Sequence, residues 1–200
     1  MITKNKAALI IIDIVNSCCA EQFEDPEYGI TFTKIRQMVP KLEKFIDTLR
    51  AKQLGEVIFV NLTPWTKEYL PKNIQNLYED PNVDYYGSDD ECEQEFYKLK
   101  PLASDKIITK NNYDAFTNPE LDDFLRANNI ETLIITGVFT DGCVLSTICG
   151  GFARGYNIVV PRDLVETTDL PIRQRLARDL LDYVIPMQYG KVVNSEKLLA

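Results

Sequence analysis

Short, nearly continuous apolar segments recur along the chain, and each is typical of a strand buried on both faces of a parallel sheet. Between them, apolar residues recur at steps of three and four, which predicts amphipathic helices. This alternation predicts an α/β fold with a mostly parallel, doubly wound sheet and helices on both faces. The predicted strands occupy residues 7–15, 56–62, 105–110, 133–135, 156–160 and 192–193.

The predicted helices differ in how clearly they begin and end. The first spans residues 35–49, with Pro40 expected to kink it or start a new first turn and Gly55 expected to end it. A second begins at residues 118–120, where the sequence Asn-Pro-Glu supplies a cap, a proline and an acid. A late helix over about residues 170–182 is expected to turn three apolar side chains inward: Ile172, Leu176 and Leu180.

Residues 132–156 combine an apolar strand, a short turn and a helix. The turn lies between Gly137 and Gly142, and the helix is predicted to begin at Cys143. The first turn of a helix presents free N–H groups and the positive end of the helix dipole, which stabilise a thiolate and can receive an oxyanion. A buried cysteine that only packs explains this stretch equally well, since free cysteine is often buried.

Charge and hydropathy exclude several kinds of partner. The 200 residues carry a formal net charge of −8 without a Lys/Arg cluster, so neither nucleic acid nor an anionic membrane surface is an expected partner. No apolar run approaches the roughly 20 residues of a membrane span, and residues 1–15 do not form a convincing signal peptide. We therefore expect a cytoplasmic protein, and with neither repeat nor linker we expect one domain over residues 1–200.

The cysteine and histidine counts narrow the chemistry further. Five cysteines follow no metal-ligand spacing, which predicts free thiols and no metal site. The chain contains no histidine, which excludes Ser-His-Asp and Cys-His catalysis and histidine-ligated zinc. Any enzyme built on this chain must move protons with carboxylate, lysine, tyrosine or thiol groups.

Three reactive side chains follow predicted strands. Asp13 lies near the end of the first strand, Lys110 ends the third, and Cys143 follows the fourth through the short turn. Ligands bind outside the carboxyl ends of the strands in an open parallel sheet, so these residues should meet at one edge. Together they form a complete catalytic set: a thiol that attacks, a carboxylate that takes and returns its proton, and an ammonium that holds the anionic state.

Other motifs fail on inspection. The two glycines at 137 and 142 are spaced as in a Walker A loop, but Cys143 and Val144 stand where lysine and a hydroxyl residue are required. No GxGxxG sequence follows a strand, which argues against a dinucleotide cofactor. Position 149 is cysteine where a phosphatase loop starting at Cys143 would require arginine. We therefore expect no cofactor.

The region from residue 63 to residue 104 has no regular pattern and is interpreted as a lid or pocket wall. It contains several prolines, acids and tyrosines, including Tyr85 and Tyr86. Trp65 follows a strand end and is expected to face substrate, although packing of the lid onto the body explains it equally well. The full set of residues expected to contact substrate is Asn16, Trp65, Tyr113, Phe116 and Val138.

Three separated segments resemble the signature motifs of the isochorismatase-like cysteine hydrolases. They read ALIIIDIVNS, KIITKNNYDAF and ITGVFTDGCVLST, stand in that family's order and spacing, and are followed by GYNIVVPRD. The resemblance extends over about residues 7–165 and is weakest across the lid. It implies a three-layer α-β-α fold around a parallel sheet of about six strands.

The resemblance also implies roles for individual residues. Cys143 would be the nucleophile, Asp13 the general base and Lys110 the cationic partner. A cis peptide bond between Val138 and Phe139 would aim the backbone N–H groups of Phe139 and Cys143 as an oxyanion hole. The implied activity is hydrolysis of a C–N bond in a small amide or carbamoyl/ureido substrate through a Cys143 thioester, in a homodimer or homotetramer.

The chain departs from parts of this family. Nicotinamidases hold a metal with histidines, and true isochorismatases lack the nucleophilic cysteine, so both activities are disfavoured. Val15 stands where many members have glutamine. Two alternatives stay open: a silent binding or scaffold protein, and a redox-sensing thiol with Cys18 or Cys149 as the resolving partner. Cys149 lies six residues beyond Cys143, nearly on the opposite helix face, which disfavours it. No role is predicted for Cys19.

Overall fold

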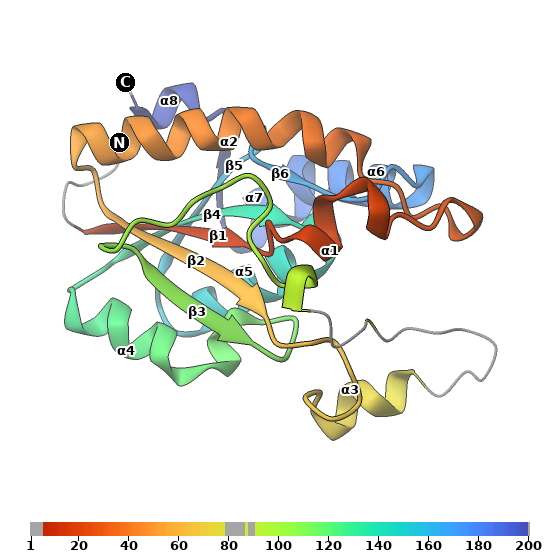
Figure 1. Cartoon of the computed structure of the whole chain (residues 1–200). Coiled ribbons are helices and arrows are strands. Elements are labelled where there is room, and N and C mark those ends of the chain that lie inside the picture. Colours follow the sequence, from red (N-terminus) through yellow and green to blue (C-terminus); the bar gives the residue numbers. More distant parts are fainter. Residues whose placement is uncertain (1–5, 79–86, 88–90, 200) are drawn as a thin grey trace.

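The computed structural model describes residues 6–78, 87 and 91–199. Its centre is a seven-stranded sheet with the strand order β3-β2-β1-β4-β5-β7, in which β6 pairs with β4 (Figure 1). All of these pairings are parallel, which confirms the predicted α/β fold. The strands are β1 (Ala7–Ile12), β2 (Glu56–Leu62), β3 (Lys106–Lys110), β4 (Thr132–Val138), β5 (Asn157–Pro161), β6 (Val165–Glu166) and β7 (Gly190–Val193).

The strand beyond the expected six is β6, which has only two residues and pairs with the end of β4. Such a short strand leaves no periodicity to recognise in a sequence. The helices are α1 (Asn16–Cys19), α2 (Thr33–Lys52), α3 (Lys72–Leu77), α4 (Pro119–Ala127), α5 (Leu145–Ala153), α6 (Pro171–Asp179), α7 (Ile185–Gln188) and α8 (Glu196–Leu199). None of the helices in the described residues has both the length and the apolar character needed to cross a membrane.

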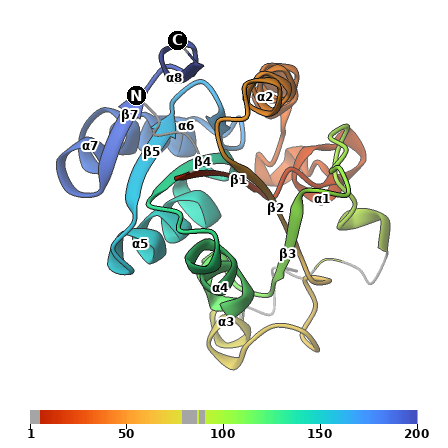
Figure 2. The ribbon, with the colours of Figure 1, turned by 90° about the vertical axis from the view of Figure 1, so that its left-hand side faces the viewer.

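Two clusters of buried side chains cover the two faces of the sheet. Figure 2 shows helices on both sides of the sheet, with α2 on one side and α4 and α5 on the other. On one face, alternate side chains of β1 pack against α2. On the other face, the intervening side chains of β1 pack against α4, α5 and residues of the C-terminal helices. Every residue of β1 is fully buried, which explains why its sequence is a continuous apolar run.

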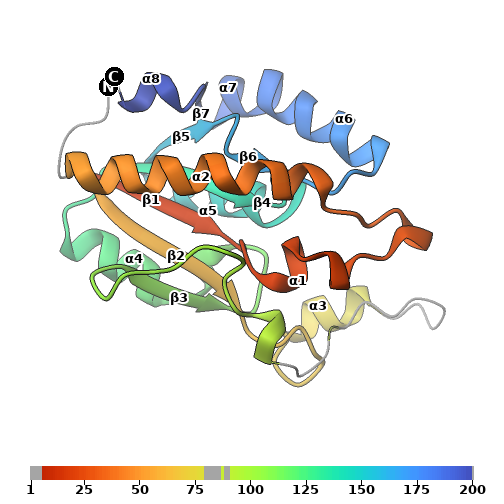
Figure 3. The ribbon, with the colours of Figure 1, turned by 45° about the horizontal axis from the view of Figure 1, so that its top comes forward.

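Helix α2 lies along one face of the sheet, as the tilted view shows (Figure 3). It runs without a break from Thr33 to Lys52 with Pro40 inside it, so the expected new first turn at Pro40 is wrong. The helix ends at Gln53 in the left-handed region (φ 51°) rather than at Gly55. Gly55 is needed for a different reason, because a Cβ atom there would lie 2.2 Å from the carbonyl oxygen of Ala7.

The helix predicted over about residues 170–182 is longer than expected, and it buries a different set of side chains. α6 continues through a π-helical turn at Leu180–Val184 into α7, and Pro186 falls in the first turn of α7. Leu180 is buried as expected, but Ile172 and Leu176 are 60% and 47% exposed. The predicted inward orientation of these two is therefore wrong, because Ala177 takes part of that buried face instead.

The strand order reverses between β1 and β4, so their carboxyl ends border the crevice where ligands bind in such sheets. Residues of the expected lid return to this edge. The backbone N–H of Tyr97 donates to the carbonyl of Ile14, and the N–H of Asn16 donates to the carbonyl of Glu95. The start of the same connection is tied to β3, since the N–H of Thr63 donates to the carbonyl of Lys110.

Candidate active site

Asp13 lies directly after β1 in a left-handed conformation (φ 50°), which aspartate tolerates better than most residues. Its backbone N–H donates to the carbonyl of Val60 on β2, and its side chain is 2% exposed. Gly137 of β4 makes this geometry possible: it has φ 103°, and a Cβ atom there would lie 2.1 Å from the carbonyl oxygen of Ile12. Glycine therefore lets the ends of β1 and β4 approach closely.

Lys110 ends β3, and its side chain is fully buried. The Nζ atom lies 2.9 Å from Oδ2 of Asp13, 2.9 Å from the carbonyl oxygen of Asn112 and 3.3 Å from Sγ of Cys143. An ammonium has three protons to donate, and these three acceptors match them. One lysine thus links the carboxylate that follows β1 to the thiol that follows β4.

Cys143 lies after an irregular turn rather than at a clean helix start. The peptide bond between Val138 and Phe139 is cis. A π-helical turn spans Thr140–Val144, and Gly142 within it leaves the helical region (φ −131°, ψ −111°) just before Cys143. The regular helix α5 follows from Leu145. The carbonyl of Phe139 accepts hydrogen bonds from the N–H groups of Gly142 and Val144, which holds the turn closed.

Burial dominates the electrostatics of these three groups. Burial raises the pKa of Asp13, although Lys110 opposes it. Burial and then the Asp13 charge raise the pKa of Cys143 well above its ordinary value, although Lys110 opposes them. Burial lowers the pKa of Lys110, but Asp13 and Cys143 together raise it above its usual value. Burial and the Asp13 charge therefore outweigh the thiolate stabilisation expected from the helix end, and they favour the neutral thiol of Cys143.

One oxygen of the site lacks a hydrogen-bond partner in the described part of the chain: Oδ1 of Asp13, which is fully buried. A buried carboxylate oxygen without a donor is costly, and a catalytic role is one explanation for such an atom in a native structure. The nearby Cys143 thiol, which interacts with this carboxyl group, carries such a proton.

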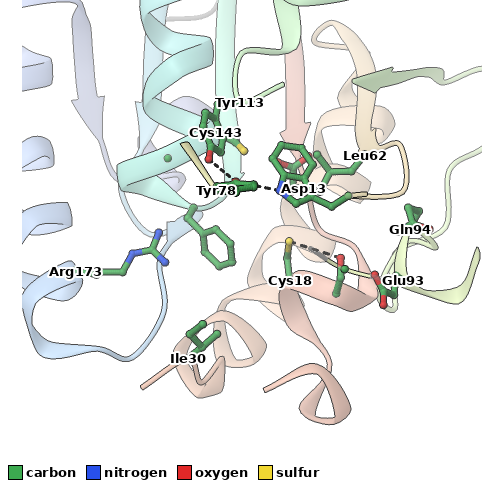
Figure 4. A pocket seen from close by; sticks show the side chains of 15 residues that line it. Asp13, Cys18, Ile30, Leu62, Tyr78, Glu93, Gln94, Tyr113, Cys143 and Arg173 are labelled. Atoms are coloured by element: carbon green, nitrogen blue, oxygen red, sulfur yellow. Dashed lines mark hydrogen bonds between the residues drawn. The ribbon is translucent and has the colours of Figure 1, made fainter. Parts of the chain in front are cut away.

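Cys143 and Asp13 line a cavity of about 420 Å³, whose other lining side chains surround them in Figure 4. Of the residues expected to contact substrate, Trp65 and Tyr113 line it. Their rings lie 5.7 Å apart, and both are joined to Tyr78: the indole N–H of Trp65 donates to the Tyr78 hydroxyl, which lies 2.7 Å from the Tyr113 hydroxyl. Burial and the Tyr78 hydroxyl raise the pKa of Tyr113.

The other three expected contact residues do not line the cavity. Asn16 instead donates its side-chain amide to the carbonyl of Cys92, tying α1 to the returning connection. Phe116 is buried on the α4 and α5 face, stacked on Tyr156. Val138 is fully buried on the α2 face of the sheet. The sequence placed these residues near the site but could not give the direction of their side chains.

Several cavity residues were missed by the sequence analysis. Arg173 reaches the cavity from α6, and Cys18 and Ser17 reach it from α1. Tyr78, Glu93 and Gln94 come from the region expected to be a lid, of which residues 79–86 and 88–90, including Tyr85 and Tyr86, lie outside the described residues. The accumulation of tyrosines and acids in that region was the available signal for Tyr78 and Glu93. For Arg173 the sequence offered none.

Within residues 6–78, 87 and 91–199, no cluster of three or more histidine, cysteine, aspartate or glutamate side chains is arranged to hold a metal ion. The cysteines of this part of the chain are free thiols. Cys143 and Cys18 both line the cavity, whereas Cys149 on α5 does not.

A family model and individual relatives were compared with this chain, and they agree on one protein family. The family model described as Isochorismatase domain matches residues 7–187. N-carbamoylsarcosine amidase from an Arthrobacter species is 24% identical over 164 residues, which cover 80% of this chain and only 60% of that protein. Ureidoacrylate amidohydrolase RutB from Yersinia enterocolitica is 26% identical over 193 residues, which cover 86% of this chain and 80% of that protein.

Solved structures show the same fold. A cysteine hydrolase from Pseudomonas syringae pv. phaseolicola superposes with a TM-score of 0.83 at 24% identity, covering 98% of this chain and 91% of the other. The N-carbamoylsarcosine amidase from Thermoplasma acidophilum superposes with a TM-score of 0.70 at 26% identity, covering 96% of this chain and 97% of the other.

Proposed function

Since the chain belongs to the isochorismatase family, we propose that it is a cysteine hydrolase that cleaves a C–N bond of a small amide or carbamoyl compound. Cys143 is the nucleophile, Asp13 the general base and Lys110 the cationic partner. The names of two relatives, an N-carbamoyl amidase and a ureidoacrylate amidohydrolase, support this reaction class.

The observation that carries the proposal is the position of the Lys110 ammonium between the carboxylate and the thiol. Its Nζ lies 2.9 Å from Asp13 Oδ2 and 3.3 Å from Cys143 Sγ, in a centre that is buried below the cavity. A buried cation at this point stabilises negative charge on either neighbour as a proton moves from one to the other. A structural ion pair would not require a thiol at hydrogen-bonding distance.

Attack begins from the neutral thiol, because burial raises the pKa of Cys143. Asp13 accepts the thiol proton on its unpartnered Oδ1 as sulfur bonds to the carbonyl or carbamoyl carbon. The resulting oxyanion is received by the backbone N–H groups of Phe139 and Cys143 in the turn after β4. Lys110 remains an ammonium throughout, since its pKa is raised.

Collapse of this intermediate breaks the C–N bond. Protonated Asp13 returns its proton to the leaving nitrogen, which departs as ammonia or an amine and leaves a thioester, or a thiocarbamate when the substrate is a carbamoyl compound. Water then attacks the same carbon while Asp13 accepts one of its protons. The C–S bond breaks, the proton passes to sulfur, and the thiol and carboxylate are restored.

Ammonia release from a panel of small amides, carbamoyl compounds and ureido acids tests the proposal. The wild type should release ammonia from at least one of these classes, and Cys143→Ala should release none above background while keeping the same circular dichroism spectrum. Cys149→Ala is the matched control, because Cys149 lies on the following helix but outside the cavity.

Full turnover by Cys143→Ala on a substrate of the wild type would show that the nucleophile is another residue. No turnover across the panel by a correctly folded wild type would favour the binding or scaffold alternative. The oligomeric state (homodimer or homotetramer) and the cytoplasmic location stay predictions. Light scattering after size-exclusion chromatography would measure the oligomeric state.

A further inference from the structure

The charged side chains around the cavity are unevenly placed. Among the described residues that line it, Asp13 and Glu93 are acids and Arg173 alone carries a positive charge. Arg173 and Glu93 come from opposite sides, with Cys143 and Asp13 between them (Figure 4). Lys110 is not part of the lining, because the thiol and carboxylate cover its ammonium. A ligand entering the cavity therefore meets one cationic end.

Arg173 is held rigidly at that end. Its Nε and Nη2 atoms donate to the two carboxylate oxygens of Asp141 at 2.7 and 2.8 Å. The Asp141 carboxylate also accepts a hydrogen bond of 2.6 Å from the hydroxyl of Thr167, and its side chain is only 6% exposed. The guanidinium carbon lies 4.8 Å from the centre of the Phe139 ring. Since the Asp141 carboxylate and the Phe139 ring both hold the guanidinium, binding a ligand would cost little side-chain entropy.

The same contacts leave part of the guanidinium open. The described residues supply no hydrogen-bond partner for Nη1, and the side chain remains 30% exposed where it lines the cavity. Arginine has five N–H groups in a planar fork, of which the Asp141 pair occupies one edge. The N–H groups that remain fit the oxygens of a second carboxylate.

We propose that Arg173 binds a carboxylate of the substrate, so that the site acts on small amide or carbamoyl acids rather than on neutral amides. This inference rests on the proposed hydrolase function. The carboxylate lies against Arg173, and the scissile carbon lies over Cys143, away from Glu93. A cavity of about 420 Å³ has room for a molecule of this kind. Arg173 is thus a substrate-binding residue that takes no part in bond cleavage.

A purely structural reading of Arg173 makes a different prediction. In that reading, Arg173 only holds Asp141 and Phe139, two residues of the turn before Cys143. Its loss would then slow every substrate alike, through kcat. Removing Asp141 would do the same, since it breaks the same ion pair from the other side. A carboxylate site instead requires the Arg173 charge itself, whereas Asp141 only holds the guanidinium in place.

Kinetics with two matched compounds separate these readings: 3-ureidopropionate, and 3-methylbutylurea, which has nearly the same size and no charge. Arg173→Gln should raise KM for the acid about 10- to 100-fold relative to the neutral urea, as expected for a lost hydrogen bond to a charged group. Asp141→Asn keeps the Arg173 charge, so it should disfavour the acid relative to the neutral urea much less than Arg173→Gln does. Arg175→Gln is the control on the same helix, because Arg175 is exposed and outside the cavity lining.

Binding without turnover provides a second readout. Calorimetry on Cys143→Ala should show tighter binding of 3-ureidopropionate than of 3-methylbutylurea, and the added Arg173→Gln change should remove that preference. If the acid binds in this way but the wild type hydrolyses neither compound nor any member of the amide and carbamoyl panel, the carboxylate site stands and the hydrolase proposal fails. If neutral ureas are hydrolysed and the acid shows no Arg173-dependent advantage, the hydrolase proposal stands and the carboxylate site fails.

The remaining outcomes also overturn the inference. Equal losses on both compounds in Arg173→Gln and Asp141→Asn would leave Arg173 a positioning residue of the turn. Tighter binding of 2-aminoethylurea, which is cationic, than of 3-ureidopropionate would make Glu93 the deciding end of the cavity. Absence of binding by all three compounds would likewise contradict a carboxylate site at Arg173.

Discussion

The floor and the wall of the cavity are built in different ways. The floor consists of Asp13 and Cys143 together with Lys110, which contacts both from beneath without lining the cavity; each of the three is at most 8% exposed. Sheet register fixes the positions of Asp13 and Lys110. Ile12, the residue before Asp13, pairs with Val60 of β2, and Leu62 of the same strand pairs with Lys110 of β3. The floor is therefore held by backbone ladders that also form the core.

The wall consists of half-buried side chains from the connections and from α6: Trp65, Tyr78, Tyr113, Phe139 and Arg173. These are positioned by contacts between side chains, such as the chain of hydrogen bonds from the Trp65 indole through Tyr78 to Tyr113. This difference indicates that the floor serves bond cleavage and folding, whereas the wall serves substrate binding. Changes in the floor should act on kcat and on folding together, whereas changes in the wall should act on KM.

Lys110→Met should give the largest effect. Methionine has a similar length but removes the charge, so the buried Asp13 loses its cation and its pKa rises further. Loss of the cation therefore favours the protonated form of Asp13, which cannot accept the thiol proton. We expect kcat/KM to fall about 10²- to 10⁴-fold, measured on a confirmed substrate.

Lys106→Met is the matched control for this change. Lys106 lies four residues earlier on β3 and pairs with Glu120 at 2.8 Å at the surface. A surface pair contributes about 1 kcal/mol or less, so activity should stay within about twofold of wild type. Equal activity of Lys110→Met and Lys106→Met would show that the floor does not use the buried cation.

The pH profile of kcat/KM should show the next effect. Burial raises the pKa of Asp13, so its carboxylate is present only above that raised value. Activity should fall about tenfold for each pH unit below an apparent pKa that exceeds the ordinary aspartate value of about 3.9. Since the Cys143 pKa is raised, we expect no gain of activity as pH passes the ordinary cysteine value of about 8.5.

Both the acidic and the alkaline side of the pH profile can contradict the assignment of Asp13 as the general base for a neutral Cys143 thiol. An acid limb at the pKa of an exposed carboxyl group would exclude a buried base. A rise of activity with an apparent pKa near that of ordinary cysteine would mean that a preformed thiolate attacks without Asp13. Because the three groups interact, the measured values belong to the cluster rather than to one residue.

Tyr113→Phe should give the smallest of the three effects. It removes the hydrogen bond of 2.7 Å to Tyr78 but keeps the ring beside Trp65. We expect KM to rise a few-fold with kcat nearly unchanged, since the net contribution of such a hydrogen bond is about 1 kcal/mol. Steady-state kinetics on the same substrate measures both constants.

Tyr156→Phe provides the comparison for this wall residue. It also removes a tyrosine hydrogen bond, of 2.6 Å to Asp122, but Tyr156 packs on Phe116 away from the cavity. It should lower the melting temperature without changing KM. A loss of kcat in Tyr113→Phe as large as that in Lys110→Met would remove the distinction between floor and wall.

The sequence predicted the floor better than the wall for a physical reason. Buried parallel strands are apolar throughout, so they stand out in the sequence, and their carboxyl ends meet at one edge. From that rule alone, the sequence predicts that Asp13, Lys110 and Cys143 lie close together. The short strand β6 and the late turn of α6 into α7 lack such a pattern.

Side-chain direction in the wall could not be predicted in the same way. Phe116 and Val138 are near the site in sequence but point into the two cores. Arg173 lies 30 residues after Cys143 and reaches the cavity only because α6 packs beside the turn that carries Asp141. The exposure of Ile172 and Leu176 has the same origin, since the side on which α6 docks is decided by tertiary contacts.

The connection between β2 and β3 has a consequence for how new activities could arise on this scaffold. Its first residue is anchored to β3 through Thr63, and its returning part is anchored to the end of β1 through Asn16 and Tyr97. The cavity residues Trp65, Tyr78 and Glu93 fall between these anchors. We therefore expect this segment to be exchangeable between relatives. Grafting it should transfer the part of substrate preference that depends on Trp65, Tyr78 and Glu93, while Arg173 and the reactive centre stay in place.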